Sequence, residues 1–114
     1  MTEPAHELLF TYGTLQYAEV QLDTFGRLVS GEADVLPGYT IDYVDVEDQR
    51  VVDLSGASVH PVLRATGSAR DKVVGRVLHL SADEIDAADE YEVSLYRRVR
   101  VTLDSGRTAW VYVG

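Results

Sequence analysis

The 114-residue sequence contains no cysteine, which excludes disulfide bonds, thiolate nucleophiles and cysteine-ligated metal sites. It also contains no run of 18 or more apolar residues, so no transmembrane helix is predicted. The first ten residues, MTEPAHELLF, carry neither a basic segment nor a long apolar stretch. A secretory signal peptide is therefore not predicted, and a cytoplasmic location is the default expectation.

Basic residues are scarce: the sequence has 10 Lys and Arg and 19 Asp and Glu, which gives a formal net charge of −9. Binding to nucleic acid or to an anionic membrane surface depends on clustered positive charge, so both kinds of partner are disfavoured. The three histidines lack the spacing of metal ligands, and no metal site is predicted. The absence of a G-x-S-x-G motif argues against serine hydrolysis.

The length and composition favour a single domain that spans residues 1–114. Hydrophobic residues make up 46% of the sequence, which is enough to fill a core. Neither an internal repeat nor a low-complexity linker interrupts the chain.

Short apolar stretches bounded by turn signals predict a chain rich in β-strands. Residues 7–14, ELLFTYGT, are typical of a buried strand that ends in a turn. Pro37-Gly38 predicts a turn into a strand, and Asp104-Ser105-Gly106 predicts the turn of a C-terminal hairpin. In KVVGRVLHL the internal glycine, Gly75, is typical of a bulge or a barrel bend. Further strand signals occur at residues 50–54 and 57–71.

Two helices are expected among these strands. Residues 15–28 predict a helix or a loop followed by a helix. Residues 81–92 predict a helix that begins at Ser81, because Ser81 and Glu84 form a capping box. The sum is an α+β, mostly β fold: a small mixed or antiparallel β-barrel, closed or nearly closed, with one or two short flanking helices.

Two acidic residues of the second helix, Glu84 and Glu92, fall on its apolar side, and the capping box explains Glu84. A helical wheel places Glu92 in the same arc as Ile85, and no capping role explains it. Partial burial, neighbouring acids and the negative end of the helix dipole would each raise the pKa of Glu92, which suits a general base near neutral pH. Alternatively the last turn frays and Glu92 is exposed, and the pattern alone favours this alternative.

Four motifs occur in a recognisable order: LFTYGTLQ, HPVLRATG with VVGRVLHL, ADEYEVSLYRR, and AWVYV. Together they resemble the gamma-glutamylcyclotransferase-like family, also called the AIG2-like or butirosin biosynthesis protein H-like family, over residues 8–113. The resemblance implies a small, mostly antiparallel β-barrel with short helices beside it. It also implies a substrate cavity at one side of that barrel.

The resemblance implies a set of site residues. The family's YGSL or YGTL loop, whose backbone holds substrate, matches residues 12–15, and its catalytic acid/base matches Glu92. The family's Y-x-R motif and late aromatic strand supply the remaining positions. The implied substrate-binding residues are Tyr12, Gly13, Thr14, Leu15, Tyr96, Arg98 and Tyr112.

The implied reaction releases 5-oxoproline and a free amine from a γ-glutamyl amine or a related small substrate, without a cofactor. The substrate's own α-amine attacks its side-chain carbonyl, so the enzyme supplies proximity and proton transfer. Glu92 would carry the proton, and backbone N–H groups of residues 13–15 would stabilise the oxyanion.

The chain departs from the family pattern at two places, since Val93 replaces a glycine and Ala88-Asp89 replaces Leu-Asp. An alternative function is therefore a non-catalytic module that keeps the barrel and binds a small amino-acid-like metabolite or a partner protein. Thr14 either contacts substrate or caps the following helix. An exposed barrel rim is compatible with a homodimer.

Overall fold

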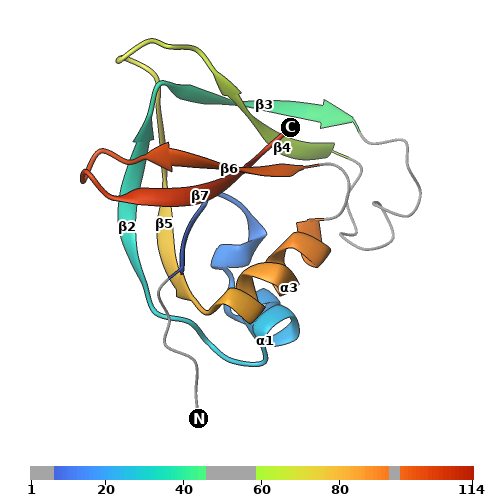
Figure 1. Cartoon of the computed structure of the whole chain (residues 1–114). Coiled ribbons are helices and arrows are strands. Elements are labelled where there is room, and N and C mark those ends of the chain that lie inside the picture. The colour runs from blue at the N-terminus through green and yellow to red at the C-terminus, as the bar shows by residue number, and fades with distance from the viewer. Residues whose placement is uncertain (1–6, 46–58, 93–95) are drawn as a thin grey trace.

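The computed structural model describes residues 7–45, 59–92 and 96–114 (Figure 1). The strand expected at residues 50–54 and the departure at Val93 lie outside these ranges. The strands are β1 (Glu7–Thr11), β2 (Gly31–Pro37), β3 (Tyr39–Asp45), β4 (Val59–Ala65), β5 (Lys72–Leu80), β6 (Arg97–Thr102) and β7 (Thr108–Val113). The helices are a 3-10 turn, η1 (Thr14–Gln16), and two α-helices, α1 (Ala18–Phe25) and α3 (Ala82–Glu92).

Five strands form one mixed sheet in the order β2-β5-β1-β7-β6. Neighbouring strands are antiparallel except for β1 and β7, which run parallel and meet at Leu9 and Trp110. Strands β3 and β4 form a separate antiparallel pair. The prediction of an α+β, mostly β fold with short flanking helices is therefore confirmed.

The sheet is not closed into a barrel, so that part of the prediction is wrong. Within the described residues the edge strands β2 and β6 share no ladder. The turn after β6 instead reaches β2 through one backbone hydrogen bond, from Asp104 N to Val35 O at 2.8 Å. Period-two alternation reports which face of a strand is buried but not which strand lies beside it, so closure could not be read from the sequence.

A buried carboxylate reinforces this contact between the two edges. Asp34 on β2 accepts hydrogen bonds from Ser105 Oγ at 2.6 Å and from Arg107 Nη2 at 2.9 Å. Burial alone would raise the pKa of Asp34, but the hydrogen bonds from Ser105, Val35 N and Arg107 together outweigh burial and lower it. Side-chain contacts thus take the place of the ladder that would close a barrel.

The five-stranded sheet carries a hydrophobic layer on each face, with β3 and β4 over one face and the helices against the other (Figure 1). Alternation along β1 divides its side chains between the layers. Phe10 enters the cluster beneath β3 and β4, whereas Leu9 enters the cluster beneath the helices. Both side chains are almost fully buried, and β1 is the middle strand of the five-stranded sheet.

The helix α3 begins where the capping box predicts. Ser81 N donates to Glu84 Oε1 at 2.9 Å, and Glu84 N donates to Ser81 Oγ at 3.2 Å. Ile85 and Ala88 are buried against the sheet. The helix extends to Glu92 and turns its exposed acids to solvent: Asp83, Asp86 and Glu90. Nowhere in the three described ranges is a helix long and apolar enough to cross a membrane.

The C-terminal hairpin is also confirmed. Strands β6 and β7 pair in register from Arg97 opposite Val113 to Thr102 opposite Thr108. Gly106 lies in the turn with a φ of 90°, a conformation that glycine adopts without a steric penalty. Leu103 N donates to Arg107 O at 2.8 Å and closes the turn.

Gly75 marks a close approach between strands and not a bulge. The β2–β5 ladder runs through Gly75 without an inserted residue, with Asp34 opposite it. A Cβ atom on Gly75 would lie 2.3 Å from Thr11 O and 2.8 Å from Phe10 Cζ. The glycine therefore makes room for the end of β1, because no side chain fits between β5 and the Phe10 ring.

We expect Gly75→Ala to lower the free energy of unfolding by about 1–3 kcal/mol, because the added methyl group displaces backbone and a core ring. Urea denaturation measures the change. Gly13→Ala is the matched control, since a Cβ atom at Gly13 meets nothing within 4 Å. Equal stability of the two variants would contradict the close approach.

Candidate active site

The predicted site residues converge at one end of the central parallel pair. Because β1 and β7 run in the same direction, their C-terminal ends meet at the same edge of the sheet. Tyr12 directly follows β1, and Tyr112 lies near the end of β7. Tyr12 Oη donates to Tyr112 O at 3.0 Å, which ties the two ends of the chain together.

Glu92 enters this region from the last turn of α3. Its side chain is partly buried, and burial raises the pKa of Glu92 to about 7 from an ordinary value of 4.5. Of the three causes expected from the sequence, desolvation is the one the structure identifies. Glu92 is neither frayed nor exposed, because α3 includes Glu92 and the Glu92 side chain is half-buried.

Four tyrosine hydroxyl groups lie close enough to Glu92 for its charge to affect them: those of Tyr12, Tyr91, Tyr96 and Tyr112. Burial raises the pKa of each phenol, and the charge of Glu92 adds to the rise in all four. The phenols therefore remain protonated over the physiological pH range. Glu92 is held among neutral hydroxyl groups, and three of them are residues that the sequence predicted.

Two of the phenols are fixed by backbone carbonyl groups. Tyr12 Oη donates to Tyr112 O, as above, and Tyr96 Oη donates to Pro61 O at 2.7 Å. The second bond links the residue before β6 to strand β4. The first bond extends the contact between the paired strands β1 and β7, and the second joins two sheets that share no ladder among the described residues.

The third predicted phenol, Tyr112, depends on a residue that the sequence analysis did not single out. Tyr112 Oη donates to Asp89 Oδ1 at 2.7 Å. Arg98 Nη2 lies 3.5 Å from Asp89 Oδ2, and the Arg98 guanidinium lies 4.4 Å from the centre of the Trp110 ring. A helical wheel leaves Asp89 outside the apolar arc of the helix. Its spacing of three residues from Glu92, which places both on one side of the helix, was the signal that could have identified it.

The loop after β1 presents backbone donors near the tyrosines. The 3-10 turn η1 follows Gly13, so the N–H groups of Thr14 and Leu15 have no partner within the turn. Neither N–H group donates a hydrogen bond to any other atom within residues 7–45, 59–92 and 96–114. Gly13 itself has a φ of −126°, and the space where its Cβ would lie is open.

The side chains of this loop are engaged within the protein. The Thr14 hydroxyl bonds to the Tyr91 hydroxyl, which joins the loop to the helix turn that carries Glu92. The Leu15 side chain is buried in the helix-side core, and Leu15 O accepts from Gln21 Nε2 at 2.9 Å. The loop can therefore offer a ligand its backbone N–H groups, while its side chains fix its position.

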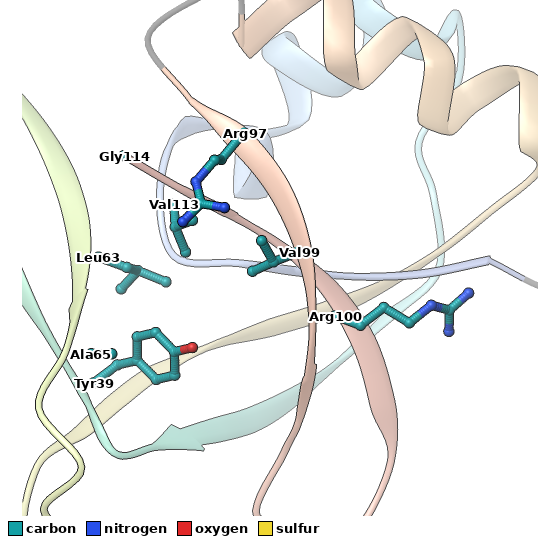
Figure 2. A pocket seen from close by; sticks show the side chains of 8 residues that line it. All are labelled: Tyr39, Leu63, Ala65, Arg97, Val99, Arg100, Val113 and Gly114. Atoms are coloured by element: carbon teal, nitrogen blue, oxygen red, sulfur yellow. The ribbon is translucent and has the colours of Figure 1, made fainter.

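The structure also has a cavity of about 360 Å³, whose lining residues are shown in Figure 2. None of the eight predicted site residues lines it. Its walls come from β3, β4, β6 and β7, and the lining residues are Tyr39, Leu63, Ala65, Arg97, Val99, Arg100, Val113 and Gly114. In the described part of the chain, His, Asp and Glu side chains form no group suited to hold a metal ion.

Comparison with solved structures supports the observed fold. Two Arabidopsis thaliana proteins with known solution structures align with TM-scores of 0.72, at 20% and 21% identity, over 94% and 99% of this chain. A structure titled "Gamma-glutamyl cyclotransferase" aligns with a TM-score of 0.68 at 15% identity, over 94% of this chain. The chain spans about two thirds of the length of these proteins, at 67%, 65% and 65%.

The family assignment comes from the sequence comparison. No curated protein sequence gives a significant match to this chain. A family profile described as "Gamma-glutamyl cyclotransferase, AIG2-like" matches residues 9–114, which is nearly the whole chain and includes every predicted site residue. With its fold shared by a structure of that title, this chain belongs to the gamma-glutamyl cyclotransferase, AIG2-like family.

Proposed function

We propose that this chain is a γ-glutamylcyclotransferase-type enzyme that releases 5-oxoproline and a free amine from a γ-glutamyl amine. The observation that carries the proposal is Glu92, a half-buried carboxyl group whose pKa is raised to about 7 by burial. A group of that pKa both accepts and returns a proton efficiently near neutral pH. The family assignment supplies the reaction class.

In the proposed mechanism, Glu92 removes a proton from the substrate's α-ammonium group. The free α-amine then attacks the γ-carbonyl carbon, so that a new C–N bond closes the five-membered ring and the carbonyl oxygen becomes an oxyanion. Protonated Glu92 returns the proton to the leaving nitrogen as the original amide C–N bond breaks. The ring nitrogen then loses the second proton of the original ammonium group, and this proton passes to the released amine, so no other reactant is consumed.

The unpaired N–H groups of Thr14 and Leu15 are suited to stabilise the oxyanion. They belong to a loop that is held rigidly by the contact between Thr14 and Tyr91 and by the bond from Gln21 to Leu15 O. Donors that are already oriented need no reorganisation when negative charge develops on the substrate.

Arg98 is suited to bind the α-carboxylate of the substrate. Its Nη1 atom is buried and has no hydrogen-bond partner among the described residues, although Nη2 lies near Asp89. A buried, unpaired donor on a charged group is costly, so an arriving carboxylate oxygen would satisfy it. The phenols of Tyr12, Tyr96 and Tyr112 remain protonated beside it and would complete a polar pocket for the glutamyl group.

We expect Glu92→Gln to reduce 5-oxoproline formation by about 10²- to 10⁴-fold, because the amide cannot transfer the proton. The wild-type kcat/KM should fall as the pH drops below about 7, since the base form of Glu92 is then lost. Chromatographic detection of 5-oxoproline from a panel of γ-glutamyl amines measures both effects.

Glu90→Gln is the matched control, because it makes the same change at an exposed acid two residues away on α3. It should retain activity. Turnover that persists in Glu92→Gln would overturn the mechanism, whereas binding without any turnover across the panel would favour the non-catalytic binding module.

We expect Glu92→Gln to be more stable than the wild type at pH 8 and equally stable at pH 4. The folded pKa of about 7 exceeds the ordinary value of 4.5, so the folded protein binds the extra proton and loses stability as the pH rises between these values. The difference should approach about 3 kcal/mol at most, at about 1.4 kcal/mol per pH unit. Denaturant curves at several pH values measure it, and a pH-independent difference would show an ordinary, exposed Glu92.

We expect Gly13→Ala to lower kcat/KM by about 10- to 100-fold with little loss of stability. The methyl group meets no protein atom within 4 Å but occupies the space through which a substrate would approach the loop. Steady-state kinetics and thermal unfolding of one preparation separate the two effects. Unchanged kcat/KM would remove the loop from the proposed site.

A further inference from the structure

The hydroxyl protons of two tyrosines near Glu92 are already committed to acceptors within the protein. Tyr96 Oη donates to Pro61 O at 2.7 Å, and Tyr112 Oη donates to Asp89 Oδ1 at 2.7 Å. A phenol has one proton to donate, and its oxygen also accepts hydrogen bonds. Each of these two oxygens can therefore offer a bound molecule an acceptor but no donor.

Both phenols lie on the face of the sheet that carries Glu92. Tyr96 and Tyr112 belong to the hydrophobic layer against which α3 packs. Asp89 and Glu92 are three residues apart on α3 and therefore share one side of that helix. Because Asp89 holds Tyr112 Oη, this hydroxyl lies beside the helix turn that ends in Glu92. The charge of Glu92 adds to the rise that burial causes in the pKa of both phenols, which agrees with this placement.

Tyr12 is not equivalent to these two tyrosines. Its hydroxyl donates to Tyr112 O, and its ring packs against the cluster on the β3–β4 side of the sheet. Burial raises the pKa of Tyr12, and a hydrogen bond from the Leu63 backbone opposes that rise, so a backbone N–H group already faces the Tyr12 oxygen. Within the part of the chain that the structure describes, no donor reaches the oxygen of Tyr96 or Tyr112.

The cation suited to the α-carboxylate lies next to these acceptors. Arg98 and Tyr112 are directly opposite each other in the β6–β7 ladder, so their side chains leave the sheet on the same face. Asp89 contacts both, since its Oδ1 accepts from Tyr112 and its Oδ2 lies 3.5 Å from Arg98 Nη2. An α-amino acid carries a carboxylate and an ammonium group on one carbon, and the site places a cation beside acceptors in the same way.

An ammonium group matches the acceptors around Glu92 in number and in kind. A primary ammonium group has three N–H donors and no acceptor. Ionised Glu92 can accept from one N–H, and the oxygens of Tyr96 and Tyr112 can accept from the other two. A ligand without these donors would leave half-buried acceptors unpaired, and an unpaired polar group lowers affinity.

We propose that Tyr96 and Tyr112 recognise the α-ammonium group of the substrate as hydrogen-bond acceptors, a proposal that rests on the proposed function. The site therefore selects γ-glutamyl compounds whose α-ammonium group is primary and unsubstituted. Both tyrosines contact the substrate without transferring a proton. Neither stabilises the oxyanion, for which the N–H groups of Thr14 and Leu15 remain the donors.

Three ligands of similar size test the proposal by binding: L-glutamate, L-2-hydroxyglutarate and glutarate. They differ in an ammonium, a hydroxyl or a hydrogen at the α-carbon, and none has an amide bond to be cleaved. We expect affinity to decrease in that order, by about 10- to 100-fold from the first to the last, at pH 8 where Glu92 is ionised.

The indole N–H signal of Trp110 reports the affinities in an NMR titration. Trp110 is the single tryptophan of the sequence, and the Arg98 guanidinium lies 4.4 Å from the centre of its ring. Binding of a carboxylate at Arg98 should therefore shift this signal for all three ligands. Equal affinities for L-glutamate and glutarate, or no binding of L-glutamate, would overturn the proposal.

Tyr96→Phe and Tyr112→Phe should each weaken binding of L-glutamate by about 5- to 20-fold and leave the affinity for glutarate within about twofold. Each substitution removes one acceptor from the ammonium group and none of the groups that bind the carboxylates. A purely structural hydroxyl would weaken both ligands alike, which would contradict the proposal. Tyr39→Phe is the matched control, because it removes a half-buried phenol on the other face of the sheet, and both affinities should stay unchanged.

Turnover of a γ-glutamyl amine separates this proposal from the proposed function. Tyr96→Phe and Tyr112→Phe should raise KM and keep kcat within about threefold, whereas loss of a donor to the oxyanion would lower kcat by about 10²- to 10³-fold. A fall in kcat of that size with an unchanged KM would refute the acceptor role and leave the proposed function standing. Absence of wild-type turnover across the substrate panel, together with ammonium-dependent binding, would overturn the proposed function alone.

Discussion

The parallel pairing of β1 with β7 is the contact on which the rest of the structure depends. These strands come from opposite ends of the chain, yet they lie side by side at the centre of the sheet. Their shared direction brings Tyr12 within hydrogen-bonding distance of Tyr112 O, across 100 residues of sequence. The same strands contribute to the core on both faces, so the packing that stabilises the fold also assembles the candidate site.

The candidate site combines an ionisable group with surroundings that oppose its ionisation. Burial raises the pKa of Glu92 to about 7, and the four phenols around it stay neutral because their own pKa values are raised. Ionisation of this buried carboxyl group above neutral pH lowers the free energy of unfolding, and such a loss of stability is common at functional sites. The cost falls on the last turn of α3, whose first turn is stabilised by the capping box.

Isolated hydrogen bonds, and not backbone ladders, join the open edges of the sheet to the strands opposite them. The edge strand β2 is held by Asp34 and one backbone hydrogen bond to the β6–β7 turn, without a ladder. At the opposite end of β6, Tyr96 bridges to Pro61 and the cavity remains open. The cavity of about 360 Å³ thus lies where β4 and β6 share no backbone ladder among the described residues.

The sequence by itself determined two features that depend on neighbouring residues: the capping box at Ser81 and the hairpin around Gly106. A helical wheel also placed Glu92 on the apolar side of its helix, but the pattern alone favoured a frayed and exposed last turn. Family resemblance, and not periodicity, linked Glu92 to the loop at Gly13. Only the tertiary structure decided that the sheet stays open, that Gly75 admits the Phe10 ring, and that Asp89 holds Tyr112. These contacts join residues far apart in the chain, and a one-dimensional pattern records which face of an element is buried but not what packs against it.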